Sequence, residues 1–327
     1  MTDIFSFMYD KYHLPDKPKL FESFSGIGCQ RMAFDRLGIN YEMVGISEID
    51  KYALQSYMAI HGDTKNYGSI CDIKGKDLPQ IDVFTYSFPC TDLSKAGKQK
   101  GLSDTRSGLV YEVLRILQEL KVEGRLPNVL IMENVVDLVQ TKFIRQFQAI
   151  QLELEQLGYT NYTQTLNAKN YGVAQNRDRV FMVSILGEYS YEFPKPTKLE
   201  KSLSDVADFK TEVPRRLLLS YYDKKGDFGE RFNTQENISP CVIAKHGYAV
   251  ITNNYYTKDF KKYSIKEIIE KDIPVYANSP IMAWRLMGVS DDQFHKAEKV
   301  CSNSQLYKQA GNGIVVDVFM AIVRNLI

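Results

Sequence analysis

Residues 20–48 read LFESFSGIGCQRMAFDRLGINYEMVGISE. The apolar, β-rich run 20–24 leads through a turn of small residues into a helical pattern at 31–37, and a second such run, 43–47, follows Gly38. A strand, a tight turn, a helix and another strand form the unit from which open parallel sheets are built. This stretch therefore predicts an α/β fold with a ligand crevice at the carboxyl ends of its strands.

The same alternation continues along the chain. Apolar runs rich in β-forming residues take turns with segments whose apolar residues are three and four apart. The further strands expected are 81–87, 128–132, 160–166 and 180–185, and the further helices are 52–61, 109–120 and 143–157. We therefore predict a doubly wound, Rossmann-like parallel sheet, with Gly38 and Gly158 ending two of its helices.

The alternation stops in the segment 188–278. This segment holds five prolines and many Tyr and Asn residues, with only short β-like runs such as 241–244 and 249–252. Helical patterns then resume at 281–287 and 314–326. We predict a smaller, mostly β or irregular domain inserted into the main one. The two domains expected are 1–187 together with 279–327, and 188–278.

The composition is that of an ordinary globular protein. The chain has 327 residues, 44% of them hydrophobic, and its 41 Lys and Arg against 40 Asp and Glu give a formal net charge of +1. No apolar run approaches the length of about 18 residues that a membrane span needs, so we expect no membrane association. Five cysteines without a C-x-x-C pair, and four histidines, predict reduced thiols in the cytoplasm and no metal site. The charge balance argues against a polybasic binder, although a local nucleic-acid groove remains compatible with it.

A turn and an acid at two strand ends suggest a cofactor. The turn Phe24-x-Gly26-x-Gly28 follows the first strand, and its small residues let a ligand approach the backbone. Glu48 follows the second strand, where an acid can bind ribose hydroxyls. Together they predict a cofactor that contains adenosine. The alternatives are plain strand-to-helix geometry for the turn and an acid that stabilises a helix N-terminus for Glu48.

Cys90 is a candidate nucleophile. It follows the strand 81–87, and Pro89 fixes the backbone before it. The alternative is a buried and inert thiol. A second Pro-Cys pair ends in Cys241, which we interpret as a residue of a short strand in the inserted segment.

Glu133 and two arginines are candidates for positions around that thiol. Glu133 follows the strand 128–132, so it can face Cys90 across the crevice and donate a proton. Arg177 and Arg179 are two residues apart, on one face of an extended segment, and guanidinium groups bind carbonyl oxygens and phosphates. The alternatives are a structural ion pair for Glu133 and edge-strand solubility for the arginines.

The order and spacing of these motifs resemble those of the DNA (cytosine-5) methyltransferases, over about 19–187 and 280–327. The motifs are Phe24-x-Gly26-x-Gly28, Glu48, Asp72, Pro89-Cys90-x-x-x-Ser94, Glu133-Asn134-Val135, Gln175-x-Arg177-x-Arg179, Arg285-Leu286-x-Gly288 and Gln309-x-Gly311-Asn312. The chain departs from the family at Glu22, where Asp is usual, at Cys29, where glycine is common, and at Ile49, where an aromatic residue often stacks on adenine.

The resemblance implies a mechanism and a cofactor. Cys90 would attack C6 of a cytosine flipped out of the duplex, and C5 would take a methyl group from S-adenosyl-L-methionine. Glu133 would bind the N3 edge, Arg179 would hold O2, and Arg177 would brace the pocket. The implied cofactor contacts are Phe24, Gly26, Gly28, Glu48, Ile49, Asp72, Ile73, Pro89, Leu109, Asn312 and Ile314.

The resemblance also implies double-stranded DNA as the substrate of a monomeric, bacterial or phage-borne enzyme, and it allows a restriction endonuclease with the same target site. The segment 188–278 corresponds to the family's variable target-recognition region, and 97–106 resembles its mobile catalytic loop. The implied DNA contacts are Ser94, Lys98, Arg106, Arg215 and Arg216.

Three alternative functions stay open. A tRNA cytosine-5 methyltransferase would share the catalytic motifs, but the Cys-Phe-Thr signature of that class does not occur here. A non-catalytic DNA-binding paralogue would tend to lose Cys90 or Glu133, and both are present. A nicotinamide-dependent dehydrogenase would need a third glycine in the turn and no thiol-acid pair.

Overall fold

The computed structural model divides the protein into two compact units. The sheet unit comprises Met1–Leu166, Asp178–Lys195 and Val318–Ile327, and the second unit comprises Asn167–Arg177 and Pro196–Asp317. The residues that the structure describes are 9–89, 108–199, 202–210, 212–216, 219, 238–242, 255–258, 263 and 265–327. Across these ranges, no helix is long and apolar enough to cross a membrane.

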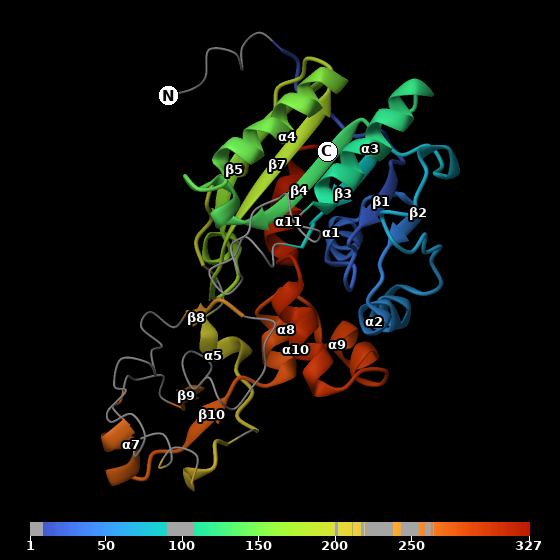
Figure 1. Ribbon diagram of the computed structural model, residues 1–327. Coiled ribbons are helices and arrows are strands. Elements are labelled where there is room, and N and C mark those ends of the chain that lie inside the picture. Colours follow the sequence, from blue (N-terminus) through green and yellow to red (C-terminus); the bar gives the residue numbers. More distant parts are fainter. Residues whose placement is uncertain are drawn as a thin grey trace. The chain divides into compact units, whose positions relative to one another are not determined.

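A six-stranded sheet with the order β2-β1-β3-β4-β7-β5 forms the centre of the sheet unit (Figure 1). Its strands are β1 Lys19–Ser23, β2 Glu42–Ser47, β3 Val83–Tyr86, β4 Val129–Val135, β5 Tyr159–Asn167 and β7 Asp178–Leu186. The four strands β2, β1, β3 and β4 are parallel to one another. The predicted strands and the Rossmann-like sheet are thereby confirmed.

One strand corrects the prediction of a wholly parallel sheet. β7 pairs antiparallel with β4, with Glu133 opposite Phe181 and Val135 opposite Arg179. The connection between β5 and β7, residues 168–177, is shorter than the dozen or more residues that a parallel crossover needs, so the chain turns back as a hairpin. This reversal brings the start of β7 beside the carboxyl end of β4.

Helices cover the sheet because their apolar residues recur on one face. The helices are α1 Cys29–Leu37, α2 Lys51–His61, α3 Leu109–Val122, α4 Ile144–Leu157 and α11 Val316–Arg324, with short 3₁₀ turns at Gly75–Asp77, Val136–Val139 and Ala168–Tyr171. α3 and α4, which lie in front of the sheet in Figure 1, share one hydrophobic core with Phe84 of β3 and Leu130 of β4. Gly38 and Gly158 end α1 and α4 in the left-handed conformation, as predicted.

The second unit is built from short elements. Its helices are α5 Leu203–Val206, α7 Ile265–Glu270, α8 Pro280–Arg285, α9 Asp291–Glu298 and α10 Asn303–Asn312. β6 Gln175–Asn176 pairs with β8 Ser239–Pro240, and β9 Tyr255–Thr257 pairs with β10 Val275–Ala277. Trp284 of α8 is fully buried, and its indole nitrogen donates to the Leu306 carbonyl of α10 at 2.9 Å.

The bounds of the two units differ from those of the two predicted domains. α8, α9 and α10 belong to the second unit, and the chain rejoins the sheet unit at Val318. Of the β-like runs expected at 241–244 and 249–252, residues 243–252 lie outside the described residues, and Cys241 follows β8 instead of lying within it. The role of 188–278 as a recognition domain stays a prediction.

Candidate active site

The turn after β1 has an unusual backbone. Phe24, Gly26 and Gly28 have φ angles of 52°, 56° and 79°, and Phe24 and Asp272 are the only described residues other than glycine with a positive φ. Bulky residues rarely adopt this conformation, so the surrounding structure must hold Phe24 there. The backbone N–H of Gly26 donates to Oε2 of Glu48 at 2.8 Å. The structure thus joins the turn and the acid that the sequence placed at two separate strand ends.

Backbone groups hold the Glu48 carboxylate in one orientation. Its Oε1 accepts hydrogen bonds from the N–H groups of Ile49 at 2.8 Å and Asp50 at 2.7 Å. Burial raises the pKa of Glu48 above its ordinary value, and the hydrogen bonds from Asp50, Gly26 and Ile49 oppose that shift. Asp50, and not Glu48, caps α2, because its side chain accepts from the N–H groups at the start of that helix. Asp50 is therefore the cap of α2, and a Glu48 carboxylate stabilised by the dipole of that helix stays an alternative.

Two serine hydroxyls near the strand ends fit a polar ligand. Ser25 in the turn and Ser87 directly after β3 have buried Oγ atoms that make no hydrogen bond within the described part of the chain. Buried hydroxyls normally have partners, so such atoms suit a site that a ligand completes. Ile49, beside Glu48, is 76% exposed and offers an apolar surface next to the acid.

The other predicted cofactor residues of the sheet unit differ in exposure. Asp72 and Pro89 are exposed, Leu109 is half-buried at the start of α3, and Ile73 is buried. Ile73 belongs to the hydrophobic core against which Leu109 and Phe24 of the turn also pack, and the cofactor roles of all four residues stay predictions.

An acid and an arginine meet at the end of β4. Oε1 of Glu133 lies 3.1 Å from Nε of Arg179 on the neighbouring β7. The Glu133 side chain is 9% exposed and that of Arg179 is 19% exposed, so the pair is largely withdrawn from water. The hairpin between β5 and β7 creates this pairing, because a parallel β7 would begin at the other end of β4. The pair combines a proton-carrying group with a donor for a carbonyl oxygen.

Asn134 is a residue whose role the sequence did not reveal beyond its place in a motif. Its side chain is buried, and its Nδ2 donates to the Phe88 carbonyl at 3.1 Å. Phe88 precedes Cys90 by two residues, so Asn134 ties the end of β4 to the chain that leads to the candidate nucleophile. Cys90 itself, and the predicted DNA contacts Ser94, Lys98 and Arg106, lie outside the described residues.

Arg177 holds the backbone of the second unit together. It is 3% exposed, and its guanidinium donates to the carbonyls of Val242 at 2.8 Å, Gly311 at 3.0 Å and Gly313 at 2.9 Å. Nη1 also lies 3.3 Å from Sγ of Cys241. A planar, permanently charged fork suits such a set of carbonyls. Through these contacts Arg177 braces the backbone of the second unit.

The remaining predicted residues also belong to the second unit. Asn312 ends α10 and is exposed, whereas Ile314 is buried. Arg215 is exposed and forms an ion pair with Asp272, and Arg216 is exposed as well. Their predicted contacts with cofactor and DNA stay predictions.

Comparisons with known proteins agree with this architecture. A family model described as C-5 cytosine-specific DNA methylase matches residues 19–327. A type II methyltransferase of Lactococcus lactis subsp. cremoris is 33% identical, with 94% of this chain and 98% of the relative covered. The type II methyltransferase M.NlaX of Neisseria lactamica is 30% identical, over 94% of this chain and 96% of its own.

Solved structures share the fold. The Entamoeba histolytica methyltransferase EhMeth superposes with a TM-score of 0.79 at 18% identity, covering 95% of this chain and 98% of its own. The S. pombe Dnmt2 methyltransferase gives a TM-score of 0.74 at 20% identity, with coverage of 94% and 98%. At this identity the likeness concerns the fold alone. The family match over residues 19–327 and the relatives at 30% identity or more carry the assignment: the chain belongs to the C-5 cytosine-specific DNA methylase family.

Proposed function

We propose that this DNA cytosine methyltransferase uses S-adenosyl-L-methionine as its methyl donor and Cys90, Glu133 and Arg179 as its catalytic residues. The Cys90 thiolate adds to C6 of the cytosine, which makes C5 nucleophilic. When bound, S-adenosylmethionine would supply the methyl group from its electrophilic sulfonium, and the neutral thioether S-adenosylhomocysteine would be the leaving group. A base then removes the C5 proton, and the bond between Cys90 and C6 breaks to restore the aromatic ring and the thiolate.

The pair of Glu133 and Arg179 is the observation that carries this proposal. Glu133 in its protonated form would donate to N3 of the base and so stabilise the adduct, while Arg179 would donate to O2. Nε of Arg179 lies 3.1 Å from Oε1 of Glu133 and Nη1 donates to the Asp178 carbonyl at 2.7 Å, so Nη2 is the donor that would reach O2 of the base. The hydrogen bond from Asn134 to the Phe88 carbonyl supports a common location for this pair and the chain segment that ends in Cys90.

The turn after β1 and Glu48 support the choice of cofactor. Three backbone donors fix the orientation of the Glu48 carboxylate and occupy both lone pairs of Oε1 and one of Oε2, so Oε2 can still accept a hydrogen bond from a ribose hydroxyl. The Ser25 hydroxyl and the glycine backbone of the turn fit the polar end of the same molecule.

Recognition of double-stranded DNA is assigned to 188–278. The stretch 210–225 carries five Lys and Arg against two acids, which suits contact with phosphates. Arg216 is the better candidate for such a contact, because Arg215 is held by Asp272. A monomeric enzyme of this kind would protect its target site from a restriction endonuclease that cuts the same sequence.

Transfer of a tritiated methyl group from S-adenosylmethionine tests the proposal, with duplex DNA and tRNA offered as substrates. We expect labelled DNA, and we expect Glu133→Gln to lower the rate by roughly 10²- to 10⁴-fold, the usual contribution of a general acid. Glu119→Gln is the matched control, since Glu119 also pairs with an arginine, Arg115, at 2.6 Å on α3. Label in tRNA alone, or equal activity of the two variants, would contradict the proposal.

A further inference from the structure

The helix that follows the cofactor turn lacks a cap of its own. α1 begins after Gly28, which offers no side chain to its first N–H groups. Glu22, fully buried near the carboxyl end of β1, supplies the missing acceptor, because its Oε1 accepts the N–H of Arg31, the third residue of α1, at 2.7 Å. A carboxylate at this position also faces the positive end of the helix dipole. The preceding strand therefore fixes where α1 starts and where the turn ends.

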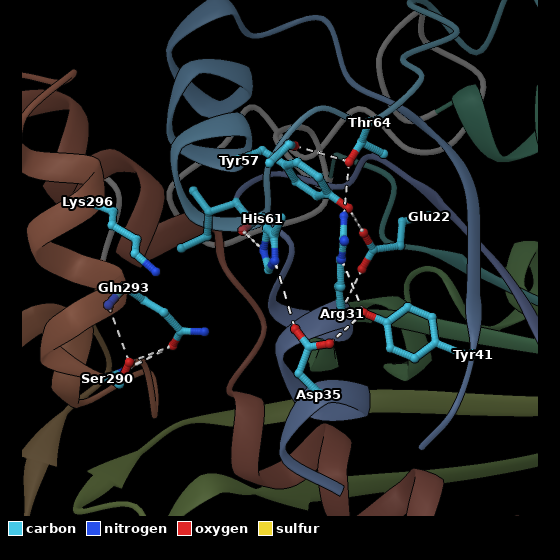
Figure 2. Close-up of polar contacts among 12 residues, drawn as sticks. Glu22, Arg31, Asp35, Tyr41, Tyr57, His61, Thr64, Ser290, Gln293 and Lys296 are labelled. Carbon is cyan, nitrogen blue, oxygen red and sulfur yellow. Dashed lines mark hydrogen bonds and ion pairs between the residues drawn. The ribbon is translucent and has the colours of Figure 1, made fainter. Parts of the chain in front are cut away.

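Tyr57 of α2 holds Glu22 in this position. Its hydroxyl donates to the second carboxylate oxygen of Glu22 at 2.8 Å, and its side chain is fully buried (Figure 2). The guanidinium of Arg31 lies over the Tyr57 ring, 5.9 Å from its centroid, and donates to Thr64 at 2.9 Å and Tyr41 at 3.1 Å. Both Glu22 oxygens thus have donors from different helices, which restricts the carboxylate to one orientation.

His61, one helical turn after Tyr57, contacts the turn directly. Its Nε2 lies 3.1 Å from the Ile27 carbonyl, and a carbonyl oxygen can only accept, so this bond requires the proton on Nε2. The rings of Tyr57 and His61 pack with their centroids 4.6 Å apart. A Cβ on Gly28 would lie 2.5 Å from the His61 ring and 2.7 Å from the Tyr57 ring. Both rings therefore pack directly against the backbone of the turn.

The same helix also begins beside the ribose acid. Asp50 caps α2, and its N–H donates to Glu48 at 2.7 Å. One end of α2 is thus attached to Glu48, and its last turn packs against Ile27 and Gly28. A shift of α2 would move the acid and the turn together.

We infer that Tyr57 and His61 are positioning residues of the cofactor site. They hold the backbone of the turn 24–28, three of whose residues are left-handed, through Glu22, Ile27 and Gly28. This inference rests on the proposed use of S-adenosylmethionine at that turn. Neither side chain touches the cofactor in this assignment. They act through the backbone whose N–H groups and open glycine positions receive it.

Binding of S-adenosylmethionine to the full-length protein, measured by calorimetry, tests the inference. Tyr57→Phe removes one hydroxyl and with it the donor to the second carboxylate oxygen of Glu22, so we expect the Kd to rise about tenfold. Tyr159→Phe is the matched control, because Tyr159 is equally buried in the same unit and its hydroxyl donates to the Pro127 carbonyl at 2.8 Å. We expect the control to change the Kd by less than about twofold, although both variants lose a comparable hydrogen bond and comparable stability.

Steady-state kinetics separates KM from kcat, and a general loss of stability does not raise the KM alone. We expect Tyr57→Phe to raise the KM for S-adenosylmethionine and to leave kcat unchanged at saturation. The reason is that the variant weakens cofactor binding equally in the ground state and in the transition state. His61→Ala should weaken binding, and His61→Gln should restore part of it, because its amide can still donate to the Ile27 carbonyl. The His61 variants decide the question if Tyr57→Phe does not fold.

Two outcomes separate the inference from the function on which it rests. A wild-type protein that does not bind S-adenosylmethionine contradicts both. A wild-type protein that binds, together with a Tyr57→Phe variant within twofold of Tyr159→Phe or a His61→Ala variant with unchanged Kd, overturns the positioning role alone.

Discussion

Glu22 should make the stability of the sheet unit fall as the pH rises. Burial raises the pKa of this carboxyl from its ordinary 4.5 to about 7, against the opposing hydrogen bonds from Tyr57 and the Arg31 backbone. The charged groups that face it are Arg31, whose charge lowers the pKa, and Asp35, whose charge raises it. The folded state therefore keeps the Glu22 proton at pH values where the unfolded chain has lost it. Stability decreases between about pH 4.5 and 7, because the unfolded state binds fewer protons there.

The size of the effect follows from the two pKa values. The interval from 4.5 to about 7 corresponds to about 3 kcal/mol of unfolding free energy, at about 1.36 kcal/mol for each pH unit. Most of this loss falls between pH 5 and 8. Glu22→Gln removes the titrating group and keeps the shape of the side chain. The stability of the wild type relative to this variant should therefore decrease by most of these 3 kcal/mol, roughly 2.5 kcal/mol, across that range.

The measurement must report on the sheet unit. The chain has one tryptophan, Trp284, and it lies in the second unit, so its fluorescence does not follow the environment of Glu22. Hydrogen exchange of β1 and α1 peptides, compared between variant and wild type at the same pH, reports on the right unit. Glu119→Gln is the control, since the Gly75 backbone N–H and Arg115 lower the pKa of Glu119 and keep it ionised throughout pH 5 to 8. A difference between wild type and Glu22→Gln that is flat, or that grows with pH, would refute the reasoning.

Three further outcomes are expected. Glu48→Ala should weaken S-adenosylmethionine binding by about 1.5 to 3 kcal/mol, the range for hydrogen bonds to a charged group, and an unchanged dissociation constant in calorimetry would refute this. Arg177→Lys should destabilise the second unit by about 2 kcal/mol, because an ammonium group does not reach the carbonyls of Val242, Gly311 and Gly313 together. Tryptophan fluorescence during urea unfolding measures this loss, and an unchanged unfolding midpoint would count against the bracing role. A folded, cofactor-binding chimera that carries the segment 188–278 of a relative should methylate a different DNA sequence, and methylation of the original sequence would show that recognition lies elsewhere.

Local patterns in the sequence were sufficient for most of the sheet unit. The period of apolar residues located every strand of the six-stranded sheet to within a few residues, and Gly38 and Gly158 marked helix ends by their backbone freedom. The motif order predicted the family, and the match over residues 19–327 confirms it. Strand positions and helix ends could be predicted because they depend mainly on residues that are close in the chain.

Local sequence patterns could not predict features that depend on residues far apart in the chain. The direction of β7 depends on the length of its connection to β5, and its reversal creates the pairing of Glu133 with Arg179. Glu22 was noted only as a departure from the family, whereas the structure shows it as the cap of α1, held by Tyr57 from another helix. Periodicity does not reveal a hydrogen bond between residues 35 positions apart.

Bisulfite sequencing of DNA from cells that express the chain tests the central claim most directly. Wild-type protein should protect one cytosine within a fixed sequence context from conversion, and Cys241→Ser should retain most of this protection. Cys90→Ser should abolish it, because serine does not supply the thiolate that adds to C6. DNA without protected cytosines from cells that contain folded wild-type protein, or equal protection by the Cys90→Ser variant, would contradict the account.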